Sequence, residues 1–314
     1  MNATPRSVSK SENLAMGQNA VRRPGKRNWL DTLVPYLFIS PFLLSFLVLF
    51  VGPAIYSLVL SFYRYQGYGT ATWVGFNNYD ATLNYELFWT ELGNTIFYWL
   101  AHSIPLVIIA FLLAVLVYSK LVEHKRVFKP LLFMPQLVAA VAAALVFKNF
   151  FGTQYGLLNT VLGTKVQWLD NSEIARWVVV FVIVWRSTAY WFVVFLAGLT
   201  AINPEINEAA TVDGASAWQQ MIHITIPLMR RTFLVFFVLD AVWAMRLFET
   251  PNVLTGAMGG LAPAAMAPIL NLIVSNVQSA LFGQAAATGW LLFIVIGVIS
   301  FIQFRLFRER NEEA

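Results

Sequence analysis

The sequence predicts an all-α integral membrane protein with six transmembrane helices. Hydrophobic residues make up 58% of its 314 residues and charged residues only 12%, whereas soluble domains average roughly 45–50% and 25%. Six apolar segments also reach the roughly 20 residues that a helix needs to cross about 30 Å of hydrocarbon. Their expected limits are residues 32–62, 93–118, 130–151, 176–201, 232–250 and 284–306.

The segments outside these spans are short or basic. The first 30 residues lack the apolar core and small-residue cleavage site of a signal peptide, so we expect a disordered, basic cytoplasmic tail at 1–30. Residues 31–310 form the expected membrane domain, and residues 311–314 a C-terminal tail. The first span contains three prolines, which predict a kink or a short re-entrant start: Pro35, Pro41 and Pro53.

The positions of lysine and arginine predict the orientation. Basic residues beside membrane spans mark cytoplasmic loops. They occur in the N-terminal tail, in the 119–129 loop and near the C-terminus, whereas residues 65–92 contain only acids and residues 250–304 carry no charge. Both termini and the polar segment 203–230 are therefore expected on the cytoplasmic side.

The polar segment 203–230 has the pattern of a helix, a turn and a second helix. Asn203 precedes a proline and is suited to cap a helix. Glu208 lies early in that helix, where a carboxylate is favoured. Gly214 permits a left-handed turn before the chain resumes as helix, and Pro227 is expected to end the excursion.

This segment resembles the cytoplasmic coupling loop of ATP-binding-cassette importer permeases. The family pattern is Glu-Ala-Ala, then Asp-Gly-Ala, then Ile-x-x-Pro, and it is present at 208–210, 213–215 and 224–227. The resemblance extends over roughly 35–308 and points to the carbohydrate-uptake branch, since Phe128-Lys-Pro-Leu-Leu-Phe-Met-Pro135 and similar runs follow in the same order. It implies the type I importer permease fold.

The resemblance also implies partners and roles. It implies a permease subunit in the bacterial inner membrane, assembled with a second homologous permease, two ATPase subunits and an extracytoplasmic substrate-binding protein. The chain has no phosphate-binding loop. We therefore expect no enzymatic activity and no cofactor of its own, with ATP and Mg²⁺ bound by the ATPases. The residues expected to couple to them are Glu208, Ala209, Ala210, Asp213 and Gly214.

Polar and aromatic residues inside the spans are candidate substrate contacts. Ionisable groups at membrane depth are costly unless they face a cavity or a partner, and sugars stack on aromatic rings. The candidates are Arg186, Ser187, Tyr190 and Trp191 in the fourth span and Asp240 and Trp243 in the fifth. Two alternatives stay open: an ion pair between Arg186 and Asp240, and aromatic residues that face lipid.

The sequence also bears on alternative substrates and functions. Arg186 or Arg246 could bind phosphate if the substrate is a glycerol phosphate derivative. A secondary transporter usually has two related halves, and no inverted duplication is visible. The absence of cysteine and the spacing of the three histidines exclude common metal sites, and no patch suits nucleic acid.

His102, near Pro105, is expected to relieve a kink by hydrogen bonding, and residues 264–273 to form a re-entrant or surface helix.

Overall fold

The computed structural model describes residues 29–119, 122–256 and 260–307. The tail expected at 311–314 and nearly all of that at 1–30 lie outside the described residues. The chain separates into two units, Met1–Tyr56 and Ser57–Ala314, and each is described by itself.

The first apolar span is helical throughout. Helix α1 (Trp29–Phe46) is followed directly by the π-helical turn η2 (Leu47–Val51) and by α2 (Gly52–Leu60). Gly52 donates its N–H to the carbonyl of Leu47, five residues back, and such π-turns are a known cause of helix bending. The expected re-entrant start is wrong, because the irregularity is confined to this one turn before Pro53.

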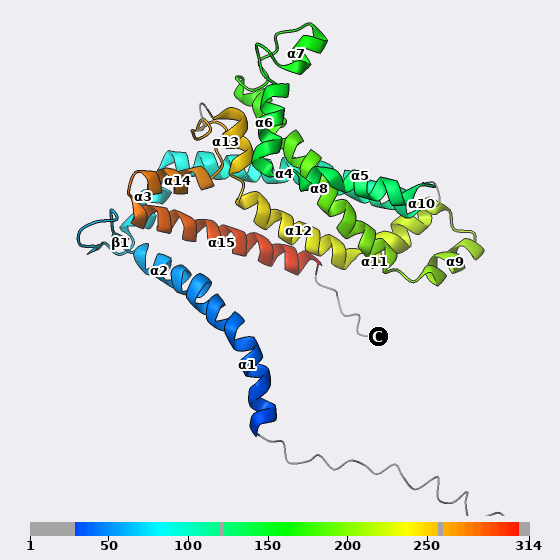
Figure 1. Cartoon of the computed structure of the whole chain (residues 1–314), viewed down its shortest axis with the longest axis horizontal. Coiled ribbons are helices and arrows are strands. Elements are labelled where there is room, and N and C mark those ends of the chain that lie inside the picture. Colours follow the sequence, from blue (N-terminus) through cyan, green and yellow to red (C-terminus); the bar gives the residue numbers. More distant parts are fainter. Residues whose placement is uncertain (1–28, 120–121, 257–259, 308–314) are drawn as a thin grey trace, which may run out of the picture. The chain divides into compact units, whose positions relative to one another are not determined.

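Three further helices are long and apolar enough to cross a membrane. They are α4 (Glu86–Tyr118), α8 (Ser172–Thr200) and α15 (Phe282–Phe307). α4 begins earlier than the expected residue 93, because its polar first two turns continue the same helix. α4 packs along α8, and α15 packs along α12 (Arg230–Met245) (Figure 1).

The two remaining expected spans are bent. Helices α5 (Lys125–Leu137) and α6 (Ala140–Phe150) meet at 89°, so the span expected at 130–151 is broken in its middle. Two prolines inside α5 each remove a backbone donor, and Val138 after it is extended. The structure thus has four long helices, or six spans if each bent pair counts as one, within the residues it describes.

The second bent pair joins the coupling loop to the membrane domain. α9 (Pro204–Val212) is followed by α10 (Ala217–Gln220), η3 (Met221–Thr225) and α11 (Ile226–Leu228). The 63° bend into α12 comes at Met229. The polar segment was expected to end at Pro227, but helix α11 continues through that residue.

The fifth span is shorter than expected. α12 ends at Met245 rather than near 250, and the chain resumes as a separate helix α13 (Glu249–Thr255).

Short elements complete the second unit. Strands β1 (Tyr63–Arg64) and β2 (Thr72–Trp73) pair antiparallel, with Tyr63 opposite Trp73. The remaining short helices are α3 (Asn77–Leu83), α7 (Leu157–Leu162) and α14 (Leu270–Gln278).

An irregular segment is held against α4 by side chains rather than by helix formation. Four residues on one face of α4 bind the backbone of 264–272: Glu91, Asn94, Thr95 and Tyr98. Residues 264–269 are not helical, so the helix expected at 264–273 is wrong except where α14 begins. Irregular backbone at membrane depth is tolerated when protein groups satisfy it.

The main apolar core lies where α4, α8 and α12 meet. Trp191 and Phe236 are fully buried and pack edge to face with ring centroids 4.7 Å apart. Phe195 and Leu106 extend the same cluster. This core fixes α8 against α12, so residues one or two turns before it in α8 and after it in α12 line a common cavity.

Candidate functional site

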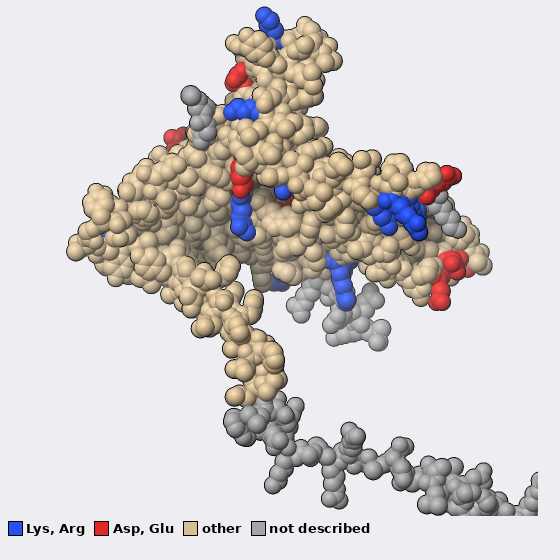
Figure 2. All heavy atoms as spheres, viewed as in Figure 1, with Lys and Arg blue, Asp and Glu red and all other residues tan. Residues whose placement is uncertain are grey.

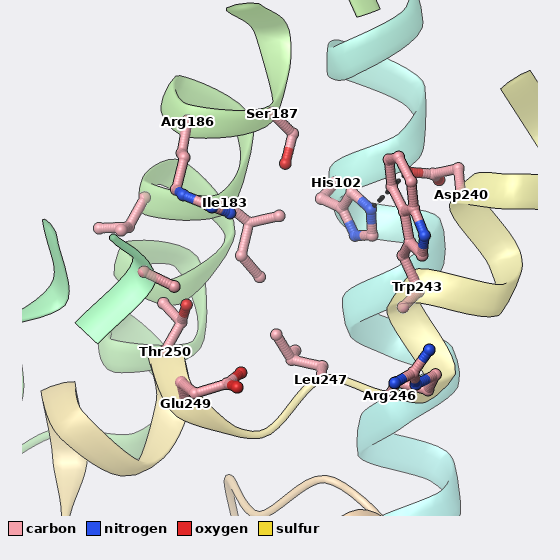
Figure 3. A pocket seen from close by; sticks show the side chains of 13 residues that line it. His102, Ile183, Arg186, Ser187, Asp240, Trp243, Arg246, Leu247, Glu249 and Thr250 are labelled. Carbon is pink, nitrogen blue, oxygen red and sulfur yellow. Dashed lines mark hydrogen bonds and ion pairs between the residues drawn. The ribbon is translucent and has the colours of Figure 1, made fainter. Parts of the chain in front are cut away.

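A cavity of about 190 Å³ lies between α4, α8, α12 and α13 (Figure 3). Arg186, Ile183 and Ser187 project into it from α8, opposite His102 of α4 and Trp243 of α12. Four sequence-predicted substrate contacts line it: Arg186, Ser187, Asp240 and Trp243. Its other lining residues are Ala140, Val182, Ala244, Arg246, Leu247, Glu249 and Thr250.

Asp240 is held by two side chains of α4. Its Oδ1 lies 3.1 Å from His102 Nε2, and its Oδ2 accepts a hydrogen bond from Ser103. Asp240 is only 2% exposed and His102 4%, so this polar cluster is buried at the cavity wall. Within the described residues Asp240 contacts His102 and Ser103 and not Arg186, so the Arg186–Asp240 ion pair is wrong.

Arg186 is anchored at the break between α5 and α6. Its Nε donates to the carbonyl of Val138, 3.1 Å away, the residue that follows α5. Carbonyls at a helix C-terminus lack intrahelical partners and attract cations. Arg186 therefore stabilises the bend while lining the cavity, where its terminal nitrogens have no hydrogen-bond partner among the described residues.

The three predicted aromatic contacts separate into two roles. Trp243 is 43% exposed and lines the cavity. Tyr190 is half-buried and packs against Trp243 with ring centroids 5.2 Å apart, outside the lining. Trp191 is fully buried in the apolar core. Tyr190 and Trp191 thus support the cavity wall in this conformation and do not form it.

Two charged residues reach the cavity from its α13 end. Arg246 and Glu249 line it and are exposed, and neither side chain makes a hydrogen bond or ion pair within the described residues. No cluster of three metal-ligating side chains occurs in the described ranges.

The coupling loop folds through local capping. Asn203 accepts a hydrogen bond from the Glu205 N–H, with Pro204 in the first turn, as the sequence predicts. Gly214 has φ +82°. Ala215 N–H bonds to the Ala210 carbonyl, and Gly214 N–H bonds to that of Thr211, a Schellman pattern that ends α9.

The second helix of the loop begins with a capping box. Ser216 and Gln219 each bind the other's backbone N–H. Helix therefore resumes at Ala217.

Most of the predicted coupling residues lie on the surface. Glu208, Ala209, Asp213 and Gly214 are exposed, and acidic side chains gather over α9 (Figure 2). Ala210 is the exception, since it is only 9% exposed and packs within the chain. A hollow of about 360 Å³ lies between the two halves of the loop, lined by Asp213, Gly214 and His223 among others.

Two exposed apolar residues on the loop were not singled out from the sequence. Val212 is 88% exposed and Trp218 is 72% exposed.

At the cavity, two polar residues were not predicted from the sequence: Ser103, which donates to Asp240, and Thr250, which lines the cavity. His102 was expected to relieve a kink. The ring of His102 bonds to the Tyr98 carbonyl at 2.6 Å, not to that of Ala101, which Pro105 leaves without a donor.

The chain was compared with characterised proteins. It is 35% identical over 301 residues to the arabinooligosaccharides transport system permease protein AraP of Bacillus subtilis (strain 168), covering 92% of this chain and 93% of AraP. It is 28% identical to the sn-glycerol-3-phosphate transport system permease protein UgpA of Agrobacterium fabrum, covering 89% of this chain and 96% of UgpA.

The fold has a close counterpart among solved structures. A subunit of a bacterial ABC transporter involved in the import of the acidic polysaccharide alginate matches with a TM-score of 0.79 and 22% identity, over 91% of this chain and all of that one. Residues 84–312 match the sequence profile of one family of permease subunits. The chain therefore belongs to the family described as binding-protein-dependent transport system inner membrane components.

Proposed function

We propose that this permease subunit passes a sugar or sugar derivative through the cavity between α8 and α12, driven by ATP hydrolysis on separate subunits. The connection between the loop and the cavity walls supports this function. The coupling loop connects the C-terminal end of α8 to the start of α12, and these two helices supply Arg186, Ser187, Asp240 and Trp243 to the cavity. A displacement of the loop is therefore delivered to both walls of the cavity.

The chemistry of the cavity suits a polyhydroxylated ligand. The Trp243 ring offers an apolar face to the C–H groups of a pyranose or furanose. Ser187 and the free guanidinium nitrogens of Arg186 can bind hydroxyls. The names of AraP and of another relative, a trehalose/maltose transport system permease protein, support this class of substrate.

The expected assembly places the loop 203–230 and both termini in the cytoplasm. A second homologous permease would close the open side of the cavity, two ATPase subunits would grip the loop, and an extracytoplasmic binding protein would deliver substrate. The exposed Glu208, Val212 and Trp218 of the loop offer charge and apolar area to such a partner. Closure of the ATPases on ATP would open the cavity outward, and hydrolysis would reset it inward.

The coupling role is tested by reversing the charge of Glu208. We expect Glu208→Lys to insert normally but to abolish uptake and substrate-stimulated ATP hydrolysis in the reconstituted transporter. Glu173→Lys is the control, because Glu173 is an exposed acid, as Glu208 is, and lies at the other end of α8. Unchanged substrate-stimulated hydrolysis in Glu208→Lys would refute the proposed coupling.

A glycerol phosphate derivative is the second candidate substrate. Arg246 and the terminal nitrogens of Arg186 have no acidic partner within the described residues, and arginine binds phosphate strongly. Stimulation of ATP hydrolysis by sn-glycerol-3-phosphate, and not by neutral oligosaccharides, would favour this candidate.

A further inference from the structure

We propose that a polar pocket between β1, α3 and the start of α15 binds the head group of an anionic phospholipid. The pocket measures about 450 Å³, within the roughly 300–1,000 Å³ that is usual for small-molecule sites. It shares no lining residue with the cavity between α8 and α12. The inference goes beyond the proposed transport function, since it concerns a membrane lipid and not the transported ligand.

The pocket lies at the end of the membrane domain opposite the coupling loop. Gly283 and Gln284, which line it, belong to the first turn of α15. The other end of α15 lies near the coupling loop, because Arg230 at the start of α12 donates to the carbonyl of Leu306. Figure 1 shows β1, α3 and the start of α15 together, far from α9 and α10. With the loop in the cytoplasm, as proposed, the pocket lies at the outer leaflet.

Contacts between its three walls shape the pocket. Asn78 of α3 is only 6% exposed and donates from Nδ2 to the carbonyl of Tyr63 in β1, 2.9 Å away. Phe282 donates its N–H to the carbonyl of Tyr65 at 3.1 Å. An added Cβ at Gly283 would collide with the Tyr63 carbonyl, so α15 and β1 meet backbone to backbone. The pocket is therefore preformed, which lowers the entropic cost of binding.

Exposed aromatic residues place the pocket at the depth of the lipid head groups. The first apolar span ends at Leu60, shortly before β1, and α15 is itself long enough to cross a membrane. Trp73 of β2 is 64% exposed, and Tyr68 between the two strands is 76% exposed. Tryptophan and tyrosine gather at the membrane–water interface, where their rings meet both lipid and water. The chemistry of the pocket is therefore presented to head groups.

Four lining side chains are available to a ligand. They are Arg64, Gln66, Asn77 and Gln284, and none of these side chains makes a hydrogen bond or ion pair within the described residues. The guanidinium group of Arg64 can bind two phosphate oxygens at once. The three amides offer both donors and acceptors. The set suits a phosphate with polar groups attached to it.

The lining favours a head group that carries hydroxyls over one that carries an amine. Among the described residues no Asp or Glu lines the pocket, so an ammonium group would have no charged partner there. Amides bind hydroxyl groups well. A phosphoglycerol head group fits this set, with its phosphate on Arg64 and its hydroxyls on the amides.

The first test counts bound lipid. The assembled transporter is incubated in detergent with phosphatidylglycerol or phosphatidylethanolamine, and native mass spectrometry counts the lipids that each complex retains. We expect Arg64→Ala to retain one phosphatidylglycerol fewer than the wild type and an unchanged number of phosphatidylethanolamine molecules. Equal retention of phosphatidylglycerol by the two proteins, or an equal loss of both lipids, would overturn the proposal.

Two further variants accompany this test. Lys165→Ala is the control, because Lys165 is also an exposed cation but does not line the pocket, and it should retain the wild-type number. If it loses as much lipid as Arg64→Ala, the effect is one of general charge and the pocket is not the site. Gln284→Ala changes another wall without changing the charge and should also lower the retention of phosphatidylglycerol; unaltered retention would contradict the role of the amides.

The second test distinguishes the lipid from soluble ligands of related chemistry. sn-Glycerol-3-phosphate carries the same phosphate and glycerol groups without acyl chains, and arabinotriose carries hydroxyls alone. We expect an excess of either compound to leave the phosphatidylglycerol that depends on Arg64 in place. Release by sn-glycerol-3-phosphate would reassign the pocket to a soluble phosphate, and release by arabinotriose would reassign it to a sugar; either result would refute a lipid site.

Discussion

At the scale of single residues, identical side chains have different roles according to burial. Trp191 is fully buried among Phe195 and Phe236, and its ring N–H has no hydrogen-bond partner in the described part of the chain. Trp243 is 43% exposed at the cavity. The first tryptophan therefore contributes apolar contact to the core, and the second offers a ring face to a ligand.

This difference predicts opposite outcomes for two alanine variants. Trp191→Ala should lower the free energy of unfolding by about 3–5 kcal/mol, the usual cost of truncating a buried aromatic residue, as measured by denaturation in detergent. Trp243→Ala should leave stability nearly unchanged and weaken substrate uptake in proteoliposomes. If uptake by Trp243→Ala equals that of the wild type, Trp243 faces lipid or a partner and not the substrate.

At the scale of elements, the coupling loop depends on one left-handed residue. Gly214 has φ +82° and ends α9. A side chain at such a φ costs about 1–2 kcal/mol. The space around Gly214 is open, so the expected effect of a substitution comes from the backbone and not from a clash.

A matched pair of glycines tests whether this turn serves coupling. Gly163 also ends a short helix, α7, with φ +63° and open space around it. Gly214→Ala and Gly163→Ala should have a similar local cost, but only Gly214→Ala should reduce substrate-stimulated ATP hydrolysis in the reconstituted transporter. Equal ATPase activity in both variants would show that the loop does not need this turn.

The break between α5 and α6 is a second element-scale feature. Arg186 donates to the Val138 carbonyl at the end of α5. This backbone carbonyl at the break is therefore paired with a cationic side chain. We expect Arg186→Met to lower thermal stability and uptake together, and Arg186→Lys to restore part of the stability because its ammonium can reach the same carbonyl. Melting temperature and uptake are measured on each variant; a loss of uptake in Arg186→Met with wild-type stability would assign Arg186 to substrate alone.

At the scale of the whole membrane domain, side chains of two helices hold a segment distant in sequence. Asn94 donates to the carbonyls of Ala264 (3.0 Å) and Ala267 (2.9 Å), and it accepts from Arg176 at 3.0 Å. Arg176 also donates to the Ala265 carbonyl. α4, α8 and residues 264–267 are thus joined through one amide.

Removing that amide should free the segment. Asn94→Leu leaves buried carbonyls without donors, an unfavourable state, so hydrogen exchange at residues 260–272 should increase while that of α12 changes little. Asn149→Leu is the control, because Asn149 is exposed and bonds only within its own helix. Unaltered exchange at 260–272 in Asn94→Leu would mean that other contacts hold the segment.

The sequence by itself determined the membrane class, the six apolar segments, the helix–turn–helix pattern of residues 203–230 and four residues of the cavity. These follow from hydrophobic length, from capping residues such as Asn203, and from Gly214, all of which act through local physics or a motif that is contiguous in the chain. The family resemblance read from that motif is confirmed.

Only the tertiary structure decided which polar groups meet. His102 and Asp240 are 138 residues apart, and no local pattern places them in contact. The bend at Val138, the burial of Trp191 and the exposure of Trp243 likewise depend on how α8 packs against its neighbours. In a membrane helix apolar residues occur all round, so periodicity cannot distinguish a face that meets lipid from one that meets protein.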